Sequence, residues 1–176
     1  EDIFDSLKIK HEKISFFLDD VYNWAPVPLG DSLYWYKGNS NEYGAKYLSA
    51  VRDAFPDLNI IINDSGTVPK EEMPNVYAKC FAGVRLVEHD GMSQSVGEMG
   101  LMGRVTIWNG KIPCANNYKD INDVINAIRL LREGYNYKVV SKRTRGFLLE
   151  NEAKWTSLVL RLCGTDELDT TKIFRK

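Results

Sequence analysis

The sequence predicts an α/β fold in which helices cover both faces of a parallel sheet. Apolar segments of strand length alternate along the chain with segments whose apolar residues recur at helical spacing. The strand segments are continuous apolar runs, such as 32–36 and 59–63, and such runs are typical of parallel strands buried on both faces. With 176 residues, the chain has the length of one domain with a substantial core.

The strands are expected where apolar, β-branched and aromatic residues run together. Such runs occupy residues 32–36, 59–63, 82–87 and 105–108. Polar loops follow them, for example KGNSNE after the first run and DSGTVP after the second. Because a helical segment separates each run from the next, the order favours consecutive βα units and hence parallel strands.

The helices are expected where apolar residues return every three to four positions. These segments are residues 43–55, 71–80, 93–102, 120–133 and 150–162. The first should end before Pro56, because the residue preceding a proline avoids the helical conformation. Pro74 fits the first turn of the second helix. Asp120 or Asn122 can accept hydrogen bonds from the first N–H groups of the fourth helix.

The chain is expected to consist of a connector followed by one domain. Residues 1–30 form the connector, or the tail of a preceding unit, since two prolines and a glycine interrupt regular structure between Ala25 and Gly30. Residues 31–176 form the domain. Because the chain begins with Glu1 rather than Met, we expect it to be a processed or excised piece of a larger protein.

Composition and charge argue against several classes of protein. The formal net charge of -1 gives no broad attraction to nucleic acid or to anionic lipid. The three cysteines, Cys80, Cys114 and Cys163, are widely spaced and form neither a disulfide framework nor a zinc-binding pattern. We therefore expect a reducing, cytoplasmic environment and no metal site. No apolar run reaches the roughly 18 residues of a membrane span.

The most informative segment runs from Arg85 to Gly110 and is expected to form a strand, a turn, a short helix and a second strand. Acidic and hydroxyl residues occupy the junction between the first strand and the helix. In an open α/β sheet, ligands bind outside the carboxyl ends of the strands. The helix start after Gly91 offers backbone N–H groups and the positive end of the helix dipole, which together favour a phosphate.

Two carboxylates, Asp90 and Glu98, flank this helix start. With Asp90 in the preceding loop, Glu98 lies about two turns into the helix, ~10 Å along its axis. Carboxylates so placed can accept hydrogen bonds from the two ends of a polyhydroxylated ligand. Between them, the hydroxyls of Ser93 and Ser95 and the neighbouring N–H groups can hold phosphate oxygens. This arrangement suits a molecule in which a sugar, a diphosphate and a ribose follow one another.

Residues 90–107, D-G-M-S-Q-S-V-G-E-M-G-L-M-G-R-V-T-I, resemble the donor-site signature of retaining glycosyltransferases of the GT-B architecture. That signature is E-G-x-x-x-x-x-x-E-A-M-A-x-G-x-P-V-I. Asp90 replaces its first Glu, Glu98 matches its second and Gly103 matches its last glycine. The order of the earlier elements also resembles the family's C-terminal, nucleotide-sugar-binding domain. The resemblance covers residues 33–162 and implies a Rossmann-like domain that is one half of a GT-B enzyme.

The resemblance implies a role for each carboxylate. Asp90 would accept hydrogen bonds from the hydroxyls of the donor sugar, and Glu98 would hold the ribose hydroxyls. Val105, which stands where the family often has proline, is a departure that should cost little. Gly100, inside the helix, is expected to serve close packing or the approach of a ligand. Arg104 is expected to lie at the surface.

The resemblance and the helix start also assign residues to the diphosphate. Lys37, directly after the first strand, takes the place of a basic residue of the family. Arg85 is unusual in an apolar strand, and we expect it either to reach the diphosphate or to neutralise Glu88 or Asp90. The full set assigned to the diphosphate is Lys37, Arg85, Gly91, Met92, Ser93, Gln94 and Ser95.

The implied function is transfer of a hexose from a UDP-, GDP- or ADP-sugar to an acceptor, with retention of configuration. The nucleotide sugar is the donor substrate, and the family's scheme requires neither a cofactor nor a metal. The family's active site lies between two domains. The N-terminal acceptor domain is missing from this sequence, so a further domain or a partner chain would have to supply it. Alone, the chain is expected to bind the donor and to turn over little or nothing.

Three alternatives stay open. A nucleotide-sugar epimerase shares the architecture without the transfer reaction, and a non-catalytic binding module would keep only the fold. A doubly wound signalling domain is disfavoured, because Tyr36 and Lys37 stand where its acidic cluster would be. A basic cluster is expected to be a solvated face, with a membrane surface as the less favoured partner; its residues are Lys138, Lys142, Arg143 and Arg145.

Overall fold

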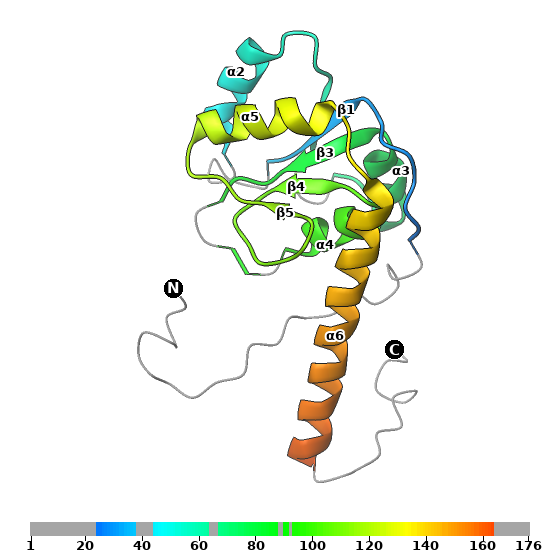
Figure 1. Cartoon of the computed structure of the whole chain (residues 1–176). Helices are drawn as coiled ribbons and strands as arrows, with labels where there is room; N and C mark the ends of the chain where they lie inside the picture. The colour runs from blue at the N-terminus through cyan, green and yellow to red at the C-terminus, as the bar shows by residue number, and fades with distance from the viewer. Residues whose placement is uncertain (1–23, 38–43, 64–66, 88–89, 92, 164–176) are drawn as a thin grey trace. The chain divides into compact units, whose positions relative to one another are not determined.

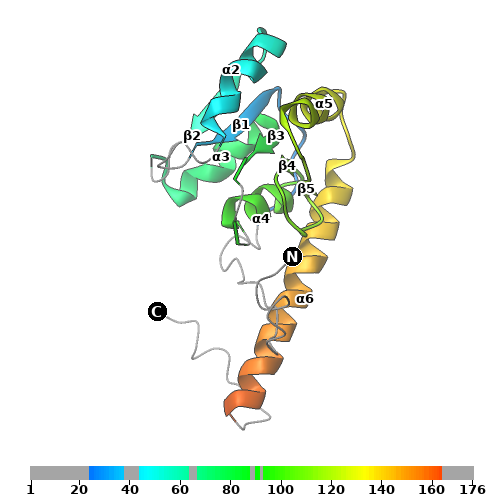
Figure 2. The ribbon, with the colours of Figure 1, turned by 90° about the vertical axis from the view of Figure 1, so that its left-hand side faces the viewer.

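The computed structural model describes residues 24–37, 44–63, 67–87, 90–91 and 93–163. These residues build a five-stranded sheet in the order β2-β1-β3-β4-β5, in which every neighbouring pair is parallel. Figure 1 labels β1, β3, β4 and β5, and Figure 2 labels β2 as well. The strands are β1 (Ser32–Tyr36), β2 (Ile60–Asn63), β3 (Cys80–Val84), β4 (Val105–Ile107) and β5 (Ala115–Asn116). The predicted Rossmann-like α/β fold is therefore confirmed.

Helices connect β1, β2, β3 and β4 in the predicted alternation, whereas β5 follows β4 without a helix between them. They are α2 (Ala45–Ala54), the 3-10 turn η2 (Lys70–Glu72), α3 (Met73–Ala78), α4 (Gln94–Leu101), α5 (Ile121–Arg132) and α6 (Tyr137–Cys163). Pro74 lies in the first turn of α3, as its fixed φ requires. Asp120 caps α5, since its carboxylate accepts hydrogen bonds from the N–H groups of Asn122 and Asp123.

The starts of β3 and of the last helix were predicted wrongly, and β5 was not predicted. β3 begins at Cys80, immediately after α3, because neither glycine nor proline separates the two elements. β5 was missed, since two residues show no periodicity. The last helix begins at Tyr137 rather than near residue 150, and the N–H of Val139 bonds to the side chain of Asn136 at its start. The many charges between residues 138 and 145 hide its apolar spacing.

The helices cover both faces of the sheet (Figure 2). Leu33 and Trp35 of β1 pack into one core cluster with residues of α2 and α5. Tyr34, between them, points to the opposite face and joins a second cluster with residues of α3 and α4. This alternation follows from the pleat of a strand, which directs successive side chains to opposite faces.

Contacts divide the chain into two compact units, residues 18–147 and residues 1–17 with 148–176. The sheet lies in the first unit, and α6 begins there. Of the expected connector, residues 24–30 are described and are bonded to this unit. The N–H of Gly30 donates to the carbonyl of Cys80 at 3.2 Å, and Arg145 donates to the carbonyl of Trp24 at 2.8 Å.

Arg104 does not lie at the surface, and this prediction was wrong. Its side chain has no exposed area. The guanidinium donates to six backbone carbonyls, at distances from 2.6 to 3.2 Å, and these belong to Val27, Pro28, Tyr77, Ala78, Cys80 and Met102. We call this set of bonds the Arg104 network. It joins the segment before β1 to the end of α3 and the start of β3.

Gly100 allows α4 to pack closely against its neighbours. A Cβ atom at this position would overlap the Sγ atom of Cys114 and would lie 2.8 Å from the side chain of Thr144 on α6. The hydroxyl of Ser141, one turn earlier on α6, donates to the carbonyl of Leu101 at 2.5 Å. Of the two expected roles for Gly100, close packing is therefore the one that the structure shows.

Gly100→Ala is expected to lower the free energy of unfolding by about 1–3 kcal/mol, as overpacking does in well-packed interiors. Urea denaturation followed by circular dichroism measures this change. Gly146→Ala is the matched control, because a Cβ at this helical position meets nothing within 4 Å. The control should raise stability by about 1 kcal/mol through helix propensity. A stabilising effect of both substitutions would contradict the packing role.

Candidate functional site

The strand order places a reversal of the chain beside β1. The chain passes through α2 to β2 on one side of β1 and then through α3 to β3 on its other side. At such a switch point the loops after neighbouring strands diverge and leave a crevice at the carboxyl ends. A pocket of about 340 Å³ lies here, a volume within the range of small-molecule sites. Its lining includes Tyr36, Arg85, Ser93, Gln94, Ser95 and Glu98.

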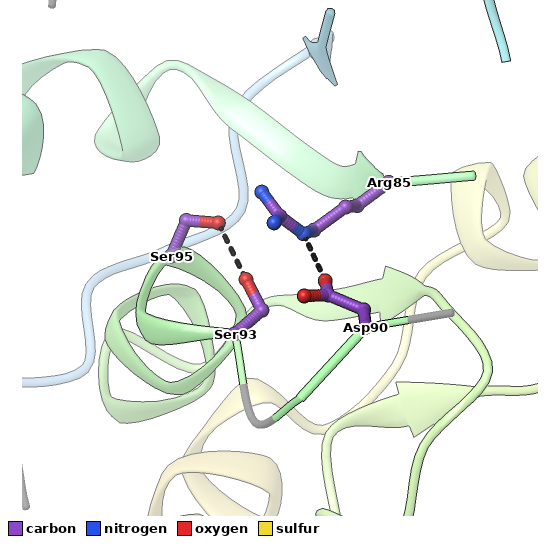
Figure 3. A network of polar contacts seen from close by, with 4 residues as sticks. All are labelled: Arg85, Asp90, Ser93 and Ser95. Carbon is purple, nitrogen blue, oxygen red and sulfur yellow. Dashed lines mark hydrogen bonds and ion pairs between the residues drawn. The ribbon is translucent and has the colours of Figure 1, made fainter. Parts of the chain in front are cut away.

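Arg85 occupies the wall of the pocket that follows β3. Its N–H donates to the carbonyl of Ile107, which extends the pairing with β4 by one residue. The guanidinium carbon lies 4.2 Å from the centre of the Tyr36 ring, and Nε donates to Asp90 Oδ2 at 2.6 Å (Figure 3). Burial alone would lower the pKa of Arg85, but the bond and charge of Asp90 raise it above its ordinary value. Arg85 is thus a fixed cation in the wall of the pocket.

The start of α4 brings two hydroxyls beside this cation. Ser93 is the N-cap residue of α4, yet its side chain makes no capping hydrogen bond. Instead Ser93 Oγ lies 3.0 Å from Ser95 Oγ, and both residues line the pocket with Arg85 (Figure 3). The N–H groups in the first turn of a helix have no intrahelical acceptor and favour an anion. One pole of the pocket therefore consists of the Arg85 cation, the two serine hydroxyls and the first N–H groups of α4. This combination suits a phosphate.

Glu98 forms a second pole of the same pocket. It lies on the buried side of α4, and its side chain is 5% exposed. Tyr77 Oη donates to Glu98 Oε2 at 3.1 Å. Burial raises the pKa of Glu98, while the hydrogen bond from Tyr77 and the positive charge of Lys70 act in the opposite direction. A carboxylate in this position is a strong acceptor for the hydroxyl groups of a ligand.

Several lining residues were not found by sequence reasoning. Tyr34, Asn63, Lys70 and Tyr77 also line the pocket. Asn63 Nδ2 donates to Tyr34 Oη at 3.1 Å, and the Tyr34 and Tyr77 rings meet edge to face at 5.2 Å. Burial raises the pKa of Tyr34 to about 12, so the phenol stays neutral. The alternation in the β1 segment, which points Tyr34 away from Trp35, was the one available signal.

The structure does not place every predicted residue in the pocket wall. Lys37 follows β1, and its N–H donates to the carbonyl of Asn63 at 3.1 Å, but Lys37 is not a lining residue. Asp90 is not a lining residue either. Its carboxylate accepts a hydrogen bond from Arg85, which is the neutralising role expected of that arginine. Gly91 is exposed beside it. Met92 and Glu88 lie outside the described residues.

The pocket therefore combines a cationic, hydroxyl-rich pole with a carboxylate pole. Such a pair of poles can bind a ligand that carries both an anionic group and free hydroxyls.

Among the described residues, no three His, Cys, Asp or Glu side chains converge as metal ligands. In the same part of the chain, no helix has the length and apolar character needed to cross a membrane. In comparisons with known proteins, no protein-family model and no curated protein sequence matches this chain.

Proposed function

We propose that this chain is the donor-binding domain of a glycosyltransferase and that its pocket binds a nucleotide-diphosphate sugar. One observation carries the proposal. Arg85, the serine pair and Glu98 line a single pocket at the switch point of a parallel sheet. An anion-binding pole and a hydroxyl-binding pole in one pocket match a ligand that has a diphosphate beside a ribose. The resemblance of residues 90–107 to a donor-site signature supports the same ligand.

In this proposal the diphosphate lies against Arg85, the hydroxyls of Ser93 and Ser95, and the first N–H groups of α4. The ribose hydroxyls donate to Glu98 from the other side. Val68 and Met73 also line the pocket and give an apolar surface on which a base can pack. The nucleotide then spans the pocket from α4 to the segment that follows β2.

The donor sugar extends from the diphosphate toward the loop that contains Asp90. Arg85 takes one oxygen of Asp90, and the other oxygen is the proposed acceptor for a sugar hydroxyl. The chemistry assigned to these residues is positioning of the donor and stabilisation of the departing diphosphate by a cation and by helix N–H groups. The acceptor side is assigned to a further domain or to a partner chain, so this chain alone should transfer little sugar.

Arg85→Gln tests the anion pole. Loss of a hydrogen-bonded cation should weaken binding of the best-bound of UDP, GDP and ADP by about 10- to 100-fold. Isothermal titration calorimetry measures this change. Arg52→Gln removes the same charge from an exposed position on α2 and should leave the affinity unaltered.

Arg85→Gln also leaves Asp90 without its partner, so the double variant Arg85→Gln with Asp90→Asn separates misfolding from loss of the cation. If the double variant regains the melting temperature and still binds poorly, the anion pole is supported. Wild-type affinity in a folded Arg85→Gln variant would count against the pole.

A further inference from the structure

Tyr77 and Glu98 form a buried pair in the lining of the pocket. Tyr77 comes from α3 and Glu98 from α4, and their side chains are 1% and 5% exposed. The phenol donates to Glu98 Oε2 at 3.1 Å. Both residues also line the pocket, so this hydrogen bond lies in the wall that a ligand would meet.

The hydrogen bond from Tyr77 engages only one of the two carboxylate oxygens of Glu98. Oε2 is taken by Tyr77, and among the described residues no other group bonds to this carboxylate. Lys70 acts on it only through its charge. Oε1 is therefore the oxygen that remains to accept a hydrogen bond from a ligand. Because Glu98 lines the pocket, Oε1 is available to accept a hydrogen bond from a ligand there.

Tyr77 is itself held in place. The Tyr34 ring meets it edge to face, with centres 5.2 Å apart, and the Trp24 ring lies 6.3 Å away. The Tyr34 hydroxyl accepts from Asn63, whose side-chain oxygen accepts from Thr67 at 2.6 Å. Hydrogen bonds and ring packing thus run from the end of β2 through β1 and α3 to Glu98 on α4. The phenol has little freedom to move with the carboxylate.

We propose that Tyr77 is a positioning residue that fixes the Glu98 carboxylate so that Oε1 selects a ribonucleotide over the 2′-deoxyribonucleotide. The inference rests on the proposed function, which places a ribose against Glu98, and it adds the residue that determines the selectivity. A carboxylate held by one oxygen presents the other in a single direction. Without the phenol, the carboxylate can turn and accept a hydrogen bond from the remaining hydroxyl or from water.

Tyr77→Phe tests the selectivity. The probes are the best-bound of UDP, GDP and ADP and the corresponding 2′-deoxynucleotide. The wild type should prefer the ribonucleotide by about 10-fold or more, as expected for a hydrogen bond to a charged acceptor. In Tyr77→Phe the preference should fall to within about threefold, because only the affinity for the ribonucleotide decreases. The affinity for the deoxynucleotide should stay unchanged.

Tyr135→Phe is the matched control. Tyr135 is a partly buried phenol whose hydroxyl accepts from the N–H of Val105 at 2.9 Å and donates to the carbonyl of Phe81 at 2.5 Å, away from the pocket. This substitution should lower the melting temperature and leave the ribose preference intact. Equal loss of preference in both variants would show a structural effect and overturn the inference.

A second readout needs no ligand. NMR titration of the Glu98 carboxyl should give a higher pKa in Tyr77→Phe than in the wild type, because the bond from Tyr77 favours the ionised form. An unchanged pKa would overturn the pairing. Nucleotide binding by the wild type without ribose preference would overturn this inference alone. A wild type that binds none of the three nucleotides would overturn the proposed function and the selectivity with it.

Discussion

Replacing Arg104 by Met is expected to lower the free energy of unfolding by at least about 3 kcal/mol, a large share of the stability of one domain. The substitution keeps most of the buried volume and removes all donors of the Arg104 network. Its six carbonyl acceptors then lose a charged partner together. The carbonyls of Cys80 and Tyr77 keep a backbone donor, from Gly30 and Lys79. Each buried carbonyl that is left without another partner costs about 1–3 kcal/mol. Urea denaturation measures the loss.

Arg132→Met is the control for this prediction. Arg132 pairs with Asp57 at 2.6 Å, but both side chains are exposed. Water replaces such a partner readily, so no measurable change in stability is expected. Arg104→Lys should lose less stability than Arg104→Met and more than Arg132→Met, because an ammonium group has fewer donors than a guanidinium and lacks its planar fork. If Arg104→Met were as stable as Arg132→Met, the network would not hold the segment before β1 to the sheet.

The second large effect is expected at Glu98. Glu98→Ala should weaken binding of a nucleotide sugar by about 10- to 100-fold, because a charged acceptor for the ribose is lost. Asp90→Ala should weaken nucleotide binding less and should mainly erase discrimination between donor sugars. Calorimetric titration of both variants with sugars that share one base measures the difference. Equal losses across all nucleotides and sugars for both variants would contradict the assigned roles.

Glu98→Gln and Glu133→Gln complete this comparison. Glu98→Gln keeps a partner for Tyr77 while removing the charge, and should therefore bind poorly with near-normal stability. Glu133 is an exposed carboxylate at the end of α5 and controls for net charge. A loss of affinity in Glu133→Gln as large as that in Glu98→Gln would point to a general electrostatic effect.

The Glu98 carboxyl should make both the stability of the fold and the binding of nucleotide depend on pH. Burial raises the pKa of Glu98, so the folded chain holds this proton to a higher pH than the unfolded chain does. Its contribution to stability is present below the unfolded pKa and is lost as pH rises through the folded pKa. Nucleotide binding has the opposite pH dependence, because it needs the ionised Glu98 carboxylate. It should weaken as pH falls through the folded pKa of Glu98. Glu98→Gln should lack this dependence.

Much of the fold was predictable because its signals are local. The apolar runs that became β1, β2 and β4 are short and bounded by polar loops, and α5 carries both its apolar stripe and its cap. Arg104 shows the limit of such reasoning. An arginine after a glycine is typical of a surface turn, and its partners are backbone carbonyls distant in the sequence. Because every residue has a backbone carbonyl, the residue types do not reveal which carbonyls bond to Arg104.

The same distinction holds for the candidate site. Ser93, Ser95 and Glu98 lie on one loop and one helix, so their spacing alone placed them together. Tyr77 and Lys70 reach the pocket because β3 lies beside β1, which brings the segment before β3 to the same crevice. Strand order was not specified by any local pattern. For that reason the sequence predicted the lining residues of α4 and missed Tyr77 and Lys70.

The most direct measurement is calorimetric titration of the chain with UDP-, GDP- and ADP-sugars, with Glu98→Ala as the control. We predict that sugars of one base bind in the micromolar to millimolar range and that the control loses this binding. Such a result would support the donor site and identify its base. Absence of binding across all three bases, by a chain that is folded by circular dichroism, would contradict the proposed function.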